Sequence, residues 1–292
     1  MLRSSPLALL LGASLALPAG VASAAITFDG ADIPTEAANN GLTQLAVQDT
    51  PTQFGNSSGA DQTSPGGSEL NALWASLDST TLTLAITGNL EANFNKMWVF
   101  LDGVAGGENV LAGDNADGGF GEINSLAGLT FANGATMDHG LRLEIGSGFH
   151  GINVFDLIDN TGSTAISGGG PGDLPLVGAT GGGLTVGWDN ANPDGVTDTD
   201  ASTALTATTG WEIAIDLATI FGETPSAVGI TTFISNGGGD FVSNQVLPGI
   251  GGGGNIGGPS GATVGVVVIP EPATLGLMVL GGTLMLSRRR GA

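Results

Sequence analysis

The residues best suited to bind a ligand lie in an acidic loop, WDNANPDGVTDTDAS, at positions 188–202. Its oxygen-bearing side chains alternate at the spacing of a calcium-binding loop, with Gly195 at the turn position. The residues in ligand positions are Asn190, Asn192, Asp194 and Asp198. Ala201 stands where such a loop carries a bidentate acid, so the match is incomplete. The pattern predicts an Asx-rich turn, with a structural Ca²⁺ site as the alternative.

Four tryptophans could stack on sugar rings if they were exposed. Trp188 lies beside the acidic loop and is the best candidate for a ligand platform, whereas Trp98 lies in a continuous apolar run and is expected in the core. The chain contains no tyrosine, which is the usual aromatic residue of polar binding faces. Core packing is therefore the expectation for most of the tryptophans.

No spacing of nucleophilic or titratable residues marks a catalytic site. The two histidines, His139 and His150, come with neither a G-x-S-x-G elbow nor an H-E-x-x-H zinc motif. Acidic pairs are numerous, but no spacing singles out a glycosidase pair. Cysteine is absent, which excludes disulfides and thiol nucleophiles. We expect a protein that is not an enzyme and has no cofactor apart from the calcium alternative.

The body of the chain, residues 25–269, is strongly acidic. It holds 26 acidic side chains against two basic ones, Lys96 and Arg142, which gives a net charge of about −24 at neutral pH. Such a surface repels phosphates and anionic lipids, so nucleic-acid binding is excluded as a function class. It attracts cations and also promotes solubility.

Short strands are predicted along the whole body. Residues 81–87 (TLTLAIT) alternate apolar and polar side chains, as in a sheet with one wet face, whereas 96–102 (KMWVFLD) are apolar on both faces. Further strands are predicted at 70–77, 140–146, 152–158, 184–188, 210–217, 228–234, 240–247 and 262–269. A helical turn is predicted at 217–221. About ten short strands with Gly, Asn and Asp turns predict an all-β fold, a single antiparallel β-sandwich or jelly-roll-like domain.

The first 24 residues have the pattern of a secretory signal peptide. Arg3 supplies the positive charge, and residues 7–17 supply a short apolar stretch. Ala22 and Ala24 are the small residues at the two positions that signal peptidase must accommodate, so cleavage is expected after Ala24.

The C-terminal segment joins a proline motif, an apolar run and an arginine cluster. The motif and the cluster consist of Pro270, Glu271, Pro272, Arg288, Arg289 and Arg290. The 14 residues 273–286 between them are uncharged and would span about 21 Å as a helix, short of the ~30 Å hydrocarbon core. A short transmembrane helix with its arginines on the cytoplasmic side is therefore expected.

This order of motif, helix and arginines resembles the PEP-CTERM sorting signal of bacterial envelope proteins, over residues 270–292. The resemblance implies processing by exosortase, a membrane enzyme that resembles a cysteine transpeptidase. A plain C-terminal membrane anchor is the alternative. Residues 69–102 and 235–258 are similar to uncharacterised secreted bacterial β proteins, and more loosely to DOMON-type and family-9-type sugar-binding modules.

The chain is thus expected to contain a signal peptide (1–24), a β-sandwich domain (25–248), a glycine-rich stalk with a final strand (249–269) and a sorting signal (270–292). We expect a secreted, non-enzymatic surface or extracellular-matrix protein of the cell envelope. Its expected partners are signal peptidase and exosortase, and the membrane through the C-terminal helix before processing. A carbohydrate-binding module for exopolysaccharide is the alternative, and a secreted hydrolase comes third.

Millimolar calcium is expected to raise the melting temperature of the full chain beyond the rise in sodium chloride of equal ionic strength. A cation that binds only the folded state stabilises it by about 2.7 kcal/mol at a hundredfold excess over Kd. The double variant Asp194→Ala, Asp198→Ala should lose this excess. Equal shifts in the two salts, or an unchanged calcium response in the double variant, would show that the loop is a turn without a metal.

Overall fold

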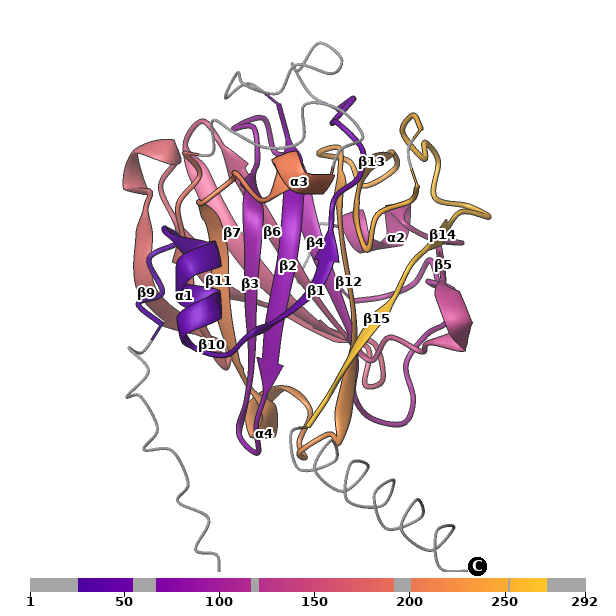
Figure 1. Cartoon of the computed structure of the whole chain (residues 1–292). Coiled ribbons are helices and arrows are strands. Elements are labelled where there is room, and N and C mark those ends of the chain that lie inside the picture. The colour runs from indigo at the N-terminus through magenta and orange to yellow at the C-terminus, as the bar shows by residue number, and fades with distance from the viewer. Residues whose placement is uncertain (1–25, 55–66, 117–120, 192–200, 252, 272–292) are drawn as a thin grey trace, which may run out of the picture.

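The structure of this protein, a computed structural model, describes residues 26–54, 67–116, 121–191, 201–251 and 253–271. Two antiparallel sheets pack against each other, and the helices are few and short (Figure 1). This confirms the expectation of an all-β fold, and the arrangement is consistent with a β-sandwich. The helical segments are α1 (Ile33–Asn39), α2 (Glu122–Ser125), α3 (Ala201–Ala204), α4 (Leu217–Ile220) and the 3-10 turns Ala132–Gly134 and Pro171–Asp173.

The first sheet has six strands in the order β1-β2-β3-β11-β10-β9, and every neighbouring pair is antiparallel. The strands are β1 (Thr43–Val47), β2 (Glu69–Leu77), β3 (Thr81–Asn89), β11 (Gly210–Asp216), β10 (Leu184–Trp188) and β9 (Leu176–Gly181). The central pair β3–β11 joins segments that are far apart in the sequence, with Ile86 opposite Trp211.

The second sheet has the order β13-β12-β4-β6-β7-β8, with β15 paired to the free part of β12. The strands are β13 (Val242–Leu247), β12 (Ala227–Ser235), β4 (Lys96–Asp102), β6 (His139–Gly146), β7 (Phe149–Asp156), β8 (Thr161–Gly168) and β15 (Val267–Pro270). Two further short strands, β5 (Thr130–Phe131) and β14 (Thr263–Val264), pair in parallel with each other.

The facing sides of the two sheets form the main hydrophobic core. Leu82, Leu84 and Ile86 of β3 are fully buried in it, as the alternation along this strand predicts, and Val99 and Leu101 of β4 belong to the same core. Burying a large apolar side chain stabilises a fold by about 1.5–3 kcal/mol. This core is the largest source of stability in a chain without disulfides.

A second cluster, here called the outer core, covers the opposite face of the second sheet. Trp98 and Phe100 of β4 contribute to it and are fully buried, so the prediction that residues 96–102 are buried on both faces is confirmed. The Trp98 indole N–H donates to Ser235 Oγ at 2.8 Å. The cover over this face comes from α2, β5, β14 and their connections, which lie on the right of Figure 1, away from α1.

Buried glutamines link the two sheets along one edge. Gln245 on β13 accepts the N–H of Leu70 on β2 at 3.2 Å and donates to the Thr50 carbonyl at 3.1 Å. Gln48 donates to the Val246 carbonyl at 3.3 Å. Both glutamine side chains are fully buried, where an amide without a partner would be costly, so these bonds fix how the edges of the two sheets meet.

The glycine-rich segment 249–261 does not form the expected stalk. Its side chains Ile250 and Ile256 pack against the outer core, and Gly257 exchanges two backbone hydrogen bonds with Val242 at 2.7 and 2.9 Å. The glycine content suggested a free chain, but two isoleucines and a strand-like bridge are enough to hold the described part of the segment on the sheet. The chain then continues into two short strands, β14 and β15, where the sequence predicts one strand at 262–269.

The N-terminal segment crosses the outer face of the first sheet and is held there by a buried carboxylate. Glu212 Oε2 accepts the N–H groups of Asp29 and Gly30, both at 3.0 Å, while Oε1 has no hydrogen-bond partner among the described residues. Burial raises the pKa of Glu212 to about 7, the neighbouring carboxylates of Glu36 and Asp29 add to this effect, and the two N–H donors oppose it.

Replacing Glu212 with glutamine should remove a pH-dependent loss of stability. Because the folded-state pKa is raised above the unfolded value near 4.5, the folded protein binds the proton more tightly. The protonated Glu212 therefore contributes its full stabilising free energy below the unfolded pKa near 4.5. This contribution is lost as the pH rises through the folded-state pKa of about 7. With solvent screening taken into account, Glu212→Gln should be more stable than the parent by about 2 kcal/mol at pH 8, and equal to it at pH 4.

Denaturant unfolding of the full chain across this pH range measures the difference, and Glu223→Gln, which removes an exposed carboxylate, is the matched control. A Glu212→Gln curve that runs parallel to the parent curve at all pH values would contradict the assignment.

Candidate functional site

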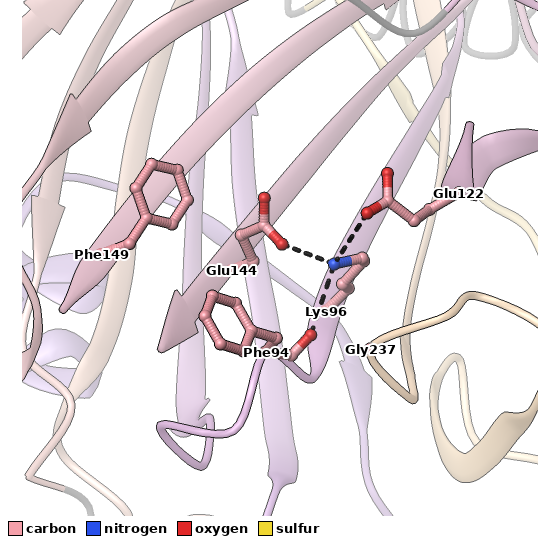
Figure 2. Close-up of a pocket in the computed structure, with 6 residues that line it drawn as sticks. All are labelled: Phe94, Lys96, Glu122, Glu144, Phe149 and Gly237. Carbon is pink, nitrogen blue, oxygen red and sulfur yellow. Dashed lines mark hydrogen bonds and ion pairs between the residues drawn. The ribbon is translucent and has the colours of Figure 1, made fainter. Parts of the chain in front are cut away.

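A pocket with a volume of about 410 Å³ opens at one end of the second sheet, and we call it the aromatic pocket. It is lined by Phe94, Lys96, Glu122, Glu144, Phe149 and Gly237 (Figure 2). Strands β4, β6 and β7 supply three of these residues, α2 supplies Glu122, and the other two come from connecting loops. Its volume is in the range of small-molecule sites, about 300–1,000 Å³.

Three charged side chains of the pocket lining and one buried arginine beside them form a closed set of ion pairs, here called the charge cluster. Its members are Lys96, Arg142, Glu122 and Glu144. Lys96 Nζ lies 2.5 Å from Glu144 Oε2 and 3.6 Å from Glu122 Oε1, and Figure 2 shows the ammonium between the two carboxylates. Arg142 completes the set, with NH1 2.5 Å from Glu122 Oε2 and NH2 3.2 Å from Glu144 Oε1.

The register of β4 and β6 creates this cluster. Lys96 lies opposite Glu144, and Arg142 lies opposite Trp98. The side chains of Lys96, Glu144 and Arg142 therefore point to the same outer face as Trp98. Lys96 and Arg142 are almost fully buried, and they are the only basic residues of the acidic body. Arg142 also donates to Asn153 Oδ1 at 3.1 Å on β7. Two cations and two carboxylates make a buried group with no net charge.

Two phenylalanine rings form the apolar walls of the pocket, and each lies over a glycine. A Cβ atom on Gly146 would be 2.2 Å from the Phe94 ring, and one on Gly151 would be 2.5 Å from the Phe149 ring. The missing side chains leave room for both rings to lie against the strands β6 and β7. Phe94 is 44% exposed, so much of its ring faces the solvent at the pocket.

The loop before β4 holds Phe94 in an unusual backbone conformation. Its φ of 70° lies in the left-handed region, which is rare for a bulky residue and costs free energy. The Phe94 N–H donates to the Ile145 carbonyl at 2.8 Å, and its own carbonyl accepts from Lys96 Nζ at 3.4 Å. On either side of Phe94, the side-chain amides of Asn93 and Asn95 donate to Glu91 Oε2, at 3.3 and 3.1 Å. The surrounding contacts therefore stabilise a conformation that the residue would not adopt alone.

The expected ligand platform, Trp188, is not on the surface. Its side chain is fully buried in the main core, 5.9 Å from the Trp211 ring and edge-on to His150 at 6.3 Å. The prediction of an exposed platform is wrong, because the last residue of a central strand still points into the core although an acidic loop follows it directly. The aromatic residues that reach the surface pocket are phenylalanines.

The predicted calcium ligands are only partly within the described chain. Asn190 is described, and its side chain exchanges two hydrogen bonds with the backbone of Leu90, at 2.7 and 2.8 Å. It therefore has a structural role in joining the loop to the end of β3. Asn192, Asp194 and Asp198 lie outside the described residues. Within the described part of the chain, no group of three or more acidic or histidine side chains could hold a metal ion.

The two histidines are both buried and contact different parts of the fold. His139 lies between two carboxylates, with Nδ1 3.5 Å from Asp138 and Nε2 3.8 Å from Asp156. His150 Nδ1 is 2.5 Å from the Gly169 carbonyl. They lie at opposite ends of the paired strands β6 and β7, so the structure does not bring them together.

Of the sorting motif, Pro270 and Glu271 are described. Pro270 is the last residue of β15, and the Glu271 N–H donates to the Ser226 carbonyl at 2.9 Å. The remaining predicted targeting residues lie outside the described chain; these are Ala22, Ala24, Pro272, Arg288, Arg289 and Arg290. Among the residues that the structure describes, no helix has the length and apolar character needed to cross a membrane.

Sequence reasoning did not find the aromatic pocket, although signals for it exist. Lys96 and Arg142 are isolated cations within apolar strands of an acidic chain, and such residues need buried acidic partners. Glu144 follows Arg142 at the strand period of two, which places both on one face. Glu122 and Phe94 lie in loops, so the sequence alone does not place them beside the strands.

No protein-family model matches this chain, and no curated protein or solved structure shows significant similarity to it.

Removing Lys96 alone from the charge cluster should destabilise the fold more than removing Lys96 together with its ion-pair partner Glu144. Lys96→Met leaves two buried carboxylates with a single cation, and an unpaired buried charge costs about 3 kcal/mol. The double variant Lys96→Met, Glu144→Leu restores neutrality and should regain more than half of that loss. Urea unfolding of the parent, both single variants and the double variant measures the coupling. Additive losses in the double variant would show that the two side chains act independently.

Proposed function

We propose that this chain is an exported, non-enzymatic protein of the cell surface or extracellular matrix, sorted by its C-terminal segment. The observation that carries the proposal is the position of β15. This strand pairs with β12 and brings the chain to Pro270 at the surface of the second sheet, and the rest of the proline motif follows directly. A sorting signal in this position would follow directly on β15, the last strand of the described chain.

A binding or structural role is favoured over catalysis by the state of the pocket carboxylates. Glu122 and Glu144 each form ion pairs with both Lys96 and Arg142. A glycosidase needs one carboxyl group with a raised pKa beside a second that is free to act as base or nucleophile. Here both carboxylates are held by the same two cations, an arrangement suited to shaping a binding surface. Carbohydrate binding is therefore the second candidate function, and the aromatic pocket is the observation that favours it.

Mature protein isolated from its native host should lack residues 1–24 and the arginine cluster. Cleavage after Ala24 and processing near Pro270 would both lower the intact mass by amounts that the sequence defines. Mass spectrometry of the surface fraction makes the measurement, and a host strain without exosortase is the control. Retention of Arg288, Arg289 and Arg290 in the mature surface protein would show a plain membrane anchor.

A further inference from the structure

We propose that the aromatic pocket binds one neutral pyranose unit of a polysaccharide. The apolar face of the sugar ring packs on Phe94 and Phe149, and its hydroxyl groups donate hydrogen bonds to Glu122 and Glu144. This inference deepens the carbohydrate-binding candidate and is independent of how the C-terminal segment is processed. Four features of the pocket carry it: rigid rings, a floor of hydrogen-bond acceptors, internal charge balance and an accessible opening.

The two rings lie packed against glycines of strands β6 and β7. Gly146 and Gly151 provide the space under them, and the loop that holds Phe94 at a φ of 70° prevents it from relaxing. Strained, over-determined positions of this kind are concentrated at ligand sites. Rings that are already ordered lose little conformational freedom on binding, so an apolar ring face can dock on them at low entropic cost.

The floor of the pocket is equipped to accept hydrogen bonds, and its lining cation is already ion-paired. The Lys96 ammonium donates to Glu144 and to the Phe94 carbonyl, and Glu122 lies 3.6 Å away as an ion-pair partner. Each carboxylate oxygen of the cluster, by contrast, contacts one cation and can accept a further bond. A ligand rich in hydroxyl groups fits this floor, because its O–H groups can donate the further hydrogen bonds that the carboxylate oxygens can accept.

The electrostatics select a neutral ligand. The positive charges of Lys96 and Arg142 neutralise the negative charges of Glu122 and Glu144 within the charge cluster, so a ligand need not carry a charge. Around it, the body carries a net charge of about −24, and this field repels carboxylated or sulfated sugars. A free inorganic cation would have to displace one of the short ion pairs that already neutralise the carboxylates.

The size and position of the pocket suit one unit of a longer chain. A volume of about 410 Å³ accommodates a single sugar ring, and the 44% exposure of Phe94 shows that the site lies at the surface. The neighbouring units of a polymer could therefore extend out of the pocket on either side.

Isothermal titration calorimetry tests the inference with the full chain and four neutral probes, namely cellohexaose, laminarihexaose, maltohexaose and mannohexaose. Oligogalacturonate is the anionic comparison. We expect at least one neutral probe to bind and oligogalacturonate to give no signal. Phe94→Ala and Phe149→Ala should each weaken binding by about tenfold or more, because each removes one stacking wall.

Gly146→Ala is the most informative variant, because it keeps every aromatic and charged residue and only displaces the Phe94 ring. It should weaken binding to a similar degree. Ile158→Ala is the matched control, since Ile158 is 43% exposed and follows the opposite end of β7. Its affinity should equal that of the parent.

Circular dichroism confirms that each variant is folded before titration, and if Phe94→Ala is unfolded the remaining two variants decide. Three outcomes would overturn the inference: no binding of any neutral probe, equal binding of oligogalacturonate, or parental affinity in all folded pocket variants. None of these outcomes would alter the mass of the mature protein, so the sorting proposal is judged separately.

Discussion

The centre of the second sheet is buried on both faces, and most of the structure follows from this constraint. Its central strand β4 sends Met97, Val99 and Leu101 into the main core and Trp98 and Phe100 into the outer core. A strand of this kind cannot be left with one face in water, so the chain needs a third layer. The connections around α2, β5 and β14 provide it, and they use residues that would otherwise form long exposed loops.

The charge cluster lies where the apolar outer face of the second sheet ends. At its edge the apolar layer gives way to Lys96 and Arg142, which need acidic partners because they lie away from water. Glu144 comes from the facing strand, and Glu122 comes from α2 in the covering layer. The ion pairs therefore tie the cover to the sheet, and they give the aromatic pocket its floor. Both basic residues of the acidic body, Lys96 and Arg142, belong to this one cluster.

Most of the buried strands could be predicted from the sequence, while the exposed edge strands β8 and β9 and the pocket could not. β4 and β10 have the predicted bounds, 96–102 and 184–188, since a strand buried in a core must show its apolar pattern. β8 and β9 are exposed edge strands with few buried side chains, so their sequences show no alternation of apolar and polar residues that would predict a strand. The pocket depends on side chains brought together from loops and strands, and this information is in the register and packing.

The attachment of β15 gives the C-terminus a defined mechanical behaviour. Only four residue pairs join this strand to β12, from Ala227 with Pro270 to Ile230 with Val267. Tension on the C-terminal segment meets first the hydrogen bond from Glu271 to Ser226 and then the Pro270 pair, and it can open this ladder one pair at a time before any load reaches β4. Because β12 also pairs with β4 from Gly229 to Ser235, detachment of β15 would lengthen the C-terminal segment and leave the β12–β4 pairing in place. The last strand would thus act as a short extensible link, yielding under force while the rest of the fold stays intact.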